Sequence, residues 1–93
     1  MDKKRLKKAR DKIDRLDKNI FNLIKKRTKA VKYILSLKKF NNQIVDRKRI
    51  NTILKKIRKK SIQHSIDPKI TNRIWRAMIG GYIDFEKRNF KKK

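Results

Sequence analysis

Residues 3–38 read KKRLKKARDKIDRLDKNIFNLIKKRTKAVKYILSLK, a stretch with neither glycine nor proline. Apolar residues recur along it at steps of three and four, which is the pattern of an amphipathic helix. At 1.5 Å per residue, such a helix would be roughly 54 Å long. A globule of 93 residues cannot cover so long an apolar stripe by itself, so we expect the stripe to meet a partner chain.

Two shorter helices are expected after a turn at residues 40–43. The second helix begins at the N-cap Asp46 and fades around residues 61–64. The third begins at Asp67-Pro68, because aspartate accepts the free N–H groups of a first turn and proline suits the first helical position. Gly80-Gly81 is expected to interrupt this helix, either permitting close approach of another helix or marking a bend. The fold class expected is all-α.

Length and composition exclude several classes of protein. A chain of 93 residues allows one small domain, so residues 1–93 are expected to form a single helical domain. Cysteine is absent and His64 is the only imidazole, which excludes disulfide scaffolds and cysteine metal sites. No apolar run exceeds three residues, and the opening MDKKRLKKAR does not resemble a signal peptide. We expect a cytoplasmic protein with no membrane partner.

The charge balance favours an anionic partner. There are 32 Lys+Arg against 8 Asp+Glu, a formal net charge of +24, which makes nucleic acid the first class to consider. However, the cations are spread along the whole chain, and Ile outnumbers Leu 14 to 6, as codon bias in an A/T-rich genome would produce. Nucleic acid is therefore not expected to be the main partner. The other class of partner that cationic sites serve is a small anionic substrate. A basic helical protein that binds nucleic acid remains the alternative to an enzyme.

Several charges fall on or beside the apolar stripes. Arg27 and Lys38 follow the stripe of the first helix and Arg10 lies on the same side. Arg49 sits beside the stripe of the second helix, and Glu86 continues that of the third. Each long side chain could instead reach water from an apolar face. Because buried cations without partners are very costly, several of them converging suggests an anion between them.

The order and spacing of these residues carry a family resemblance. The run from Arg10 to Asp17, RDKIDRLD, is followed by Arg27, Lys38, Arg49 and Glu86 at intervals of 17, 11, 11 and 37 residues from Arg10 onward. This pattern resembles the all-helical chorismate mutases, which include the related isochorismate-pyruvate lyase. The likeness extends from about Leu6 to Phe90. It implies an intertwined homodimer of three-helix protomers, each with a long first helix, and two equivalent active sites.

The resemblance also implies roles for individual residues. Arg10, donated across the dimer interface, and Arg27 would bind the two carboxylates of a dianionic substrate, in forks suited to planar anions. Lys38 and Glu86 would be the catalytic pair that faces the ether oxygen. The remaining substrate-binding candidates are Arg49, the backbone near Asp46, Ile50 and Tyr82.

The implied reaction is the Claisen rearrangement of chorismate to prephenate, in aromatic amino acid biosynthesis. A C–O bond breaks while a C–C bond forms, so catalysis consists of holding a compact conformer and stabilising charge on the ether oxygen. This chemistry requires no nucleophile, and we expect neither a metal nor a cofactor.

Two residues depart from the family pattern. Many members have glutamine where this chain has Glu86, and a carboxylate cannot donate a hydrogen bond to an ether oxygen, whereas a carboxylic acid can. Turnover is therefore expected to fall as pH rises and Glu86 loses its proton. Mutases commonly carry glutamate at the position of Ile50, accepting from the 4-hydroxyl of chorismate, whereas the lyase similarly has an apolar residue there. The interval from Lys38 to Arg49 also looks like that of the lyase. We expect a chorismate mutase, with an isochorismate-pyruvate lyase that forms salicylate and pyruvate as the alternative.

Overall fold

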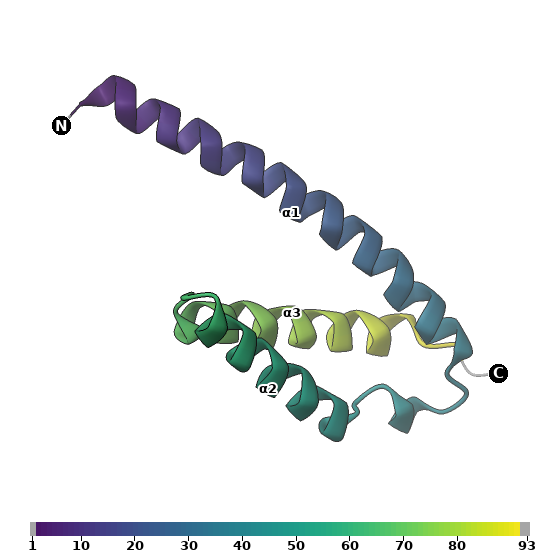
Figure 1. Ribbon diagram of the computed structural model, residues 1–93. Coiled ribbons are helices and arrows are strands. Elements are labelled where there is room, and N and C mark those ends of the chain that lie inside the picture. The colour runs from purple at the N-terminus through teal and green to yellow at the C-terminus, as the bar shows by residue number, and fades with distance from the viewer. Residues whose placement is uncertain (1, 92–93) are drawn as a thin grey trace. The chain divides into compact units, whose positions relative to one another are not determined.

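The computed structural model describes residues 2–91, which form helices and connecting loops (Figure 1). No strand occurs among these residues, so the all-α class and the long first helix are confirmed. In chain order the elements are α1 (Lys3–Leu37), the short 3-10 helix η1 (Asn41–Gln43), α2 (Arg47–Gln63) and α3 (Pro68–Asn89).

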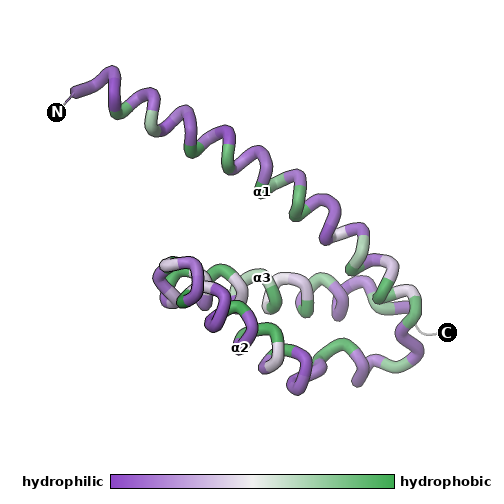
Figure 2. The backbone as a smooth tube through the Cα atoms, viewed as in Figure 1, coloured by the Kyte–Doolittle hydropathy of each residue, from purple (hydrophilic) through white to green (hydrophobic). Residues whose placement is uncertain are grey.

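The chain divides into two compact units between Tyr33 and Ile34, inside α1. The first unit is a single helix, along which polar and apolar residues alternate in Figure 2. Its large apolar side chains from Ile13 to Ile24 are 41–68% exposed. A single helix has no second element against which to bury such a stripe, because helical stability in proteins comes mainly from packing an apolar face. The expected partner chain for this stripe stays a prediction.

The turn after α1 is held by a glutamine side chain. Gln43 Oε1 accepts hydrogen bonds from the backbone N–H groups of Lys39 and Phe40, both at 2.8 Å. Ile44 follows and is only 5% exposed, the one buried apolar residue in the described part of the second unit. The turn predicted at residues 40–43 is therefore confirmed, and it brings the chain from α1 to the start of α2.

Both predicted N-caps are present. The Asp46 carboxylate accepts from the backbone N–H of Arg49 at 3.0 Å, and that of Asp67 accepts from Lys69 at 2.9 Å. Pro68 occupies the first position of α3. Each cap satisfies a donor that the helix itself leaves unpaired, which contributes about 1 kcal/mol.

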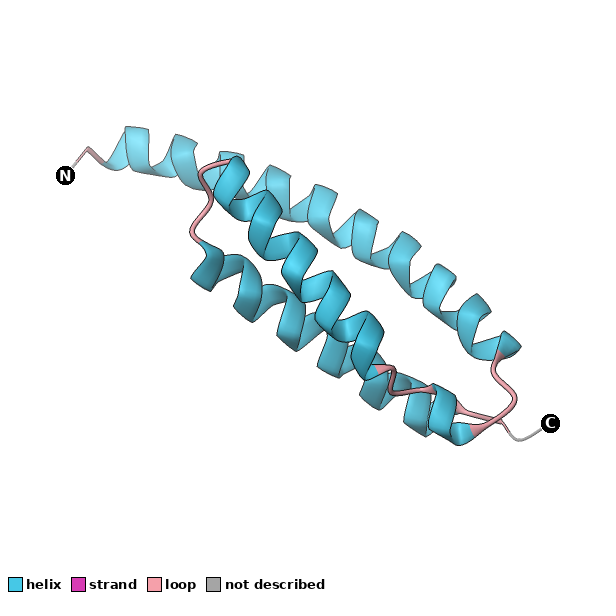
Figure 3. Cartoon of the chain, turned by 60° about the horizontal axis from the view of Figure 1, so that its bottom comes forward, coloured by secondary structure: helices cyan, strands magenta, loops and turns pink. Residues whose placement is uncertain are grey.

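Helices α2 and α3 lie side by side and run in opposite directions (Figures 1 and 3). The turn between them contains Ser65 in the left-handed region, with φ 57°. Near this turn the hydroxyls of Ser61 and Thr71 are hydrogen-bonded at 2.7 Å, and Ser61 is 3% exposed. The apolar faces of the two helices are half-buried against each other, so this pair forms the main packing of the second unit.

The predicted interruption at Gly80-Gly81 is wrong, because α3 is continuous from Pro68 to Asn89. A Cβ atom added at either glycine would meet nothing within 4 Å, so no close approach to another described segment requires them. Ile70 and Ile74, in the first turns of α3, remain exposed. Helix propensity differences of about 1 kcal/mol per glycine are small enough for the surrounding turns to override.

Candidate active site

Two of the predicted site residues, Lys38 and Glu86, are in direct contact. The Lys38 ammonium donates to Glu86 Oε2 at 2.8 Å, and the two side chains are 18% and 10% exposed. Lys38 directly follows α1, where its backbone N–H donates to the Leu35 carbonyl, and Glu86 belongs to the last turns of α3. The structure thus brings together two residues that are 48 positions apart in the chain.

This ion pair differs from the salt bridges Arg5–Asp2, Lys7–Asp11 and Arg88–Asp84, which join residues three or four apart and are largely exposed. Taking two charges out of water is costly unless each has a well-placed partner. An ammonium group has three N–H donors, and Glu86 accepts only from one of them. The remaining donors can serve another acceptor, so the pair presents an oriented, partly dehydrated cation.

Tyr82 lies one turn before Glu86 on α3. Residues four apart share a helix face, so the half-buried Tyr82 lies on the same side of α3 as the ion pair. Tyr82 and Glu86 therefore lie on one face of α3, and the predicted role of Tyr82 in substrate binding stays a prediction.

The start of α2 holds three further candidates. The Asp46 carboxylate is occupied as the N-cap, so only its backbone is available for other contacts. Arg49 is exposed and Ile50 is half-buried. Within the described residues no salt bridge includes Arg49, which leaves its guanidinium available for an anionic ligand.

Arg10 and Arg27 both lie on the helix of the first unit. Arg10 is exposed and Arg27 is half-buried. The helix between them is continuous, so the 17 residues that separate them correspond to about 25 Å along its axis. That spacing exceeds the size of a small dianion, so one copy of α1 cannot place both guanidinium groups on the same molecule.

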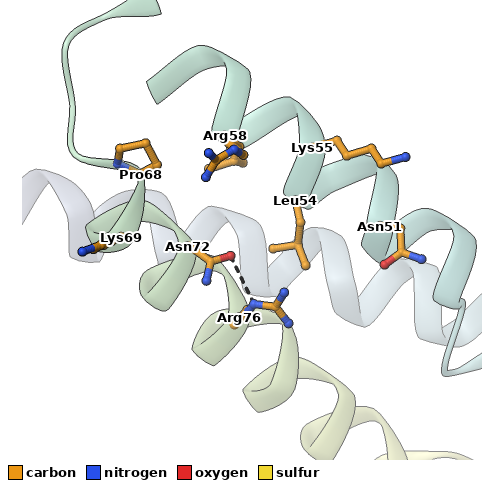
Figure 4. A pocket seen from close by; sticks show the side chains of 9 residues that line it. Asn51, Leu54, Lys55, Arg58, Pro68, Lys69, Asn72 and Arg76 are labelled. Carbon is orange, nitrogen blue, oxygen red and sulfur yellow. Dashed lines mark hydrogen bonds between the residues drawn. The ribbon is translucent and has the colours of Figure 1, made fainter. Parts of the chain in front are cut away.

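A groove of about 440 Å³ lies between α2 and α3 (Figure 4). None of the residues predicted for the site lines this groove, and the sequence reasoning missed it. The one signal in the sequence was the composition of α2, which contains eight Lys and Arg and no acidic residue. Its lining residues are Asn51, Leu54, Lys55, Ile57, Arg58, Pro68, Lys69, Asn72 and Arg76.

Comparison with known proteins gives one family. The family model described as chorismate mutase type II matches residues 9–87, which is most of the chain. The protein therefore belongs to the chorismate mutase type II family, the all-helical chorismate mutases, and the predicted resemblance is confirmed. Family membership implies an enzyme that acts on a small-molecule substrate. No curated protein and no solved structure gives a significant match.

Among the helices of residues 2–91, none combines the length and the apolar character needed to cross a bilayer.

A double-mutant cycle tests the Lys38–Glu86 ion pair. Lys38→Met and Glu86→Leu each leave one charge unpaired in a site that is mostly closed to water, whereas the double variant leaves none. The double variant should therefore lose less stability than the sum of the two singles, with a coupling free energy of about 1–3 kcal/mol. Urea denaturation of the four proteins measures this free energy. Strict additivity of the two losses would show that the pair contributes nothing.

Proposed function

We propose that this chain is a chorismate mutase that converts chorismate to prephenate for aromatic amino acid biosynthesis. The observation that carries the proposal is the Lys38–Glu86 pair, which assembles the expected catalytic couple from distant parts of a family member. Family membership supports an enzyme of the chorismate mutase class, and these two side chains support the specific activity that we propose.

In the proposed mechanism, Lys38 donates to the ether oxygen of the substrate. As the C–O bond breaks and the new C–C bond forms, negative charge grows on that oxygen. An ammonium already aimed by Glu86 stabilises this charge without having to reorganise during the reaction. All electrons move within the substrate, so no external nucleophile, oxidant or reductant is needed.

The proposed site is shared between two chains. Arg27 and Arg49 of one protomer and Arg10 of its partner bind the carboxylates. The separation of about 25 Å along α1 supports this arrangement, because a single α1 helix cannot bring Arg10 and Arg27 to one substrate. The exposed apolar stripe of α1 supports it as well, since a second chain would bury that stripe.

Ile50 supports a second candidate, the isochorismate-pyruvate lyase. It is half-buried in the first turn of α2, directly after Arg49, where an apolar side chain can accept no hydrogen bond from a substrate hydroxyl. A substrate that has no hydroxyl facing Ile50 would lose no hydrogen bond on binding. The lyase would release pyruvate and leave salicylate, again through a cyclic rearrangement of electrons within the substrate.

A paired turnover assay near pH 6 tests the function. The purified protein receives chorismate or isochorismate, and prephenate and salicylate are quantified separately. We expect prephenate from chorismate, because the Lys38–Glu86 couple supplies what the rearrangement needs. Salicylate formed from isochorismate with a much higher kcat/KM would assign the lyase instead. Inactivity with both substrates would contradict the proposed enzyme.

Mixing two inactive variants tests the shared site. Arg10→Ala and Arg27→Ala should each abolish turnover alone, because each removes one carboxylate ligand from both sites of a homodimer. In a mixed dimer, both substitutions fall in the same site and leave the other intact. Random exchange should therefore restore about a quarter of wild-type activity. Circular dichroism of each variant checks folding. Recovery that stays at zero despite exchange, confirmed by a pull-down between differently tagged chains, would contradict donation of Arg10 across the interface.

The pH dependence tests the role of Glu86. The sequence-based hypothesis makes Glu86 a proton donor and expects turnover to fall as pH rises. The ion pair instead uses Glu86 as the ionised acceptor that aims Lys38, so kcat of the wild type should not fall as pH rises. The Glu86→Gln variant, which cannot be ionised, should lose activity at every pH because its amide holds the ammonium less well. The measurement is kcat against pH for both proteins. A wild-type kcat that falls with pH, together with a fully active Glu86→Gln variant, would assign Glu86 as the proton donor.

A further inference from the structure

The groove between α2 and α3 is a second cationic site. Four of its lining residues are cations, and no acidic residue lines it: Lys55 and Arg58 come from α2, and Lys69 and Arg76 come from α3. Figure 4 shows Arg58 and Arg76 reaching the groove from the two different helices. Arg76 is held in place by a hydrogen bond from its Nε to Asn72 Oδ1 at 3.1 Å.

These four cations are not neutralised by the protein itself. Among the described residues, no salt bridge includes Lys55, Arg58, Lys69 or Arg76. Residues 47–76, which contain the whole groove, carry eleven Lys and Arg against a single Asp. That Asp67 carboxylate is already used as the cap of α3. The groove therefore lies in a strong positive potential, which raises the local concentration of anions.

A second copy of this chain is a poor occupant of the groove. It has only 8 Asp+Glu against 32 Lys+Arg with which to pair the groove cations, whereas the proposed dimer contact is the apolar stripe of α1. The proposed substrate does not explain the groove either, because none of the proposed substrate-binding residues lines it. The complementary partner is an extended anion with several charges, since the four cations lie along two neighbouring helices.

The rest of the lining indicates which part of such a partner is bound. The groove residues without charge are aliphatic, proline or amide side chains, with no aromatic ring among the lining residues. Single-stranded nucleic acids are held largely by stacking their bases on aromatic side chains. Without such a platform the groove can contact phosphates but cannot hold unpaired bases, and this favours a duplex, in which the bases are already stacked.

We propose that the α2–α3 groove binds the phosphate backbone of double-stranded nucleic acid, without reading its sequence. The four groove cations each contact a phosphate, and the two arginines can each do so through a planar fork. This binding is independent of the proposed enzyme activity, because the groove and the Lys38–Glu86 site share no residue.

The proposal predicts the salt dependence of binding. Each neutralised phosphate releases bound counterions, so log K falls against log[salt] with a slope of about −0.9 per contact on B-DNA. Four contacts should give a slope of about −3.6. A chain that attracted DNA only through its whole charge would engage more cations and give a steeper slope.

The test compares two double variants that lose the same charge. Arg58→Gln/Arg76→Gln removes two groove cations, and Arg15→Gln/Lys25→Gln removes two exposed cations from α1. Fluorescence anisotropy with a labelled DNA duplex of random sequence gives the affinity at several salt concentrations. We expect the groove variant to bind about tenfold more weakly or worse, with a slope shallower by about 2, and the α1 variant to change little. Equal losses in the two variants would overturn the proposal.

Further binding measurements distinguish between duplex DNA, duplex RNA, single strands and lipid headgroups as the source of the phosphate. Duplex RNA that binds as tightly as duplex DNA would support recognition of the backbone alone. A single strand that binds more tightly than either duplex would overturn the proposal, and so would binding to vesicles of anionic lipid with no binding to duplexes. Turnover of chorismate by the groove variant provides the folding control and should equal that of wild type. If wild type itself lacks turnover, circular dichroism replaces that control, so failure of the proposed function leaves this test intact.

Discussion

The ion pair between Lys38 and Glu86 is the constraint on which the second unit depends. Neither charge can be left alone in a largely dehydrated position, so the end of α1 must stay close to the last turns of α3. Residues 39–85 must therefore fold back so that Lys38 and Glu86 stay in contact. The turn held by Gln43 and the antiparallel α2–α3 pair are the means by which these residues do so. The same contact produces the candidate catalytic group, so the fold and the site share one interaction.

Polar contacts matter in this unit because its apolar core is thin. Ile44 is its one buried apolar residue among those described, and the facing sides of α2 and α3 are only half-buried. The hydroxyls of Ser61 and Thr71 link α2 to α3, and the two aspartate caps stabilise the start of each helix. A small domain that exposes this much apolar surface gains stability from a second chain, and this is the physical basis of the proposed homodimer.

The sequence predicted the helices well because helical periodicity and the Asp67-Pro68 start depend on neighbouring residues only. Lys38 and Glu86 are 48 positions apart, so no local rule brings them together, and they were named through the family resemblance alone. Their catalytic role stays a prediction. Gly80-Gly81 was misjudged because a modest propensity cost does not break a helix supported on both sides. The exposure of Ile70 and the α2–α3 groove could not be predicted, since both depend on how two helices align.

The Lys38–Glu86 site contains a carboxylate beside its cation, whereas the α2–α3 groove contains none. We therefore expect the two sites to suit different anions. At Lys38 the carboxylate of Glu86 offsets one positive charge and orients the ammonium, which offers directed donors to one oxygen. In the groove no acid offsets Lys55, Arg58, Lys69 and Arg76, so attraction is strong and weakly directional. A reaction that depends on geometry is served by the first arrangement, and contact with a repeating phosphate backbone by the second. The large positive charge is therefore compatible with the proposed enzyme of a small substrate, because much of it lies away from the proposed catalytic pair.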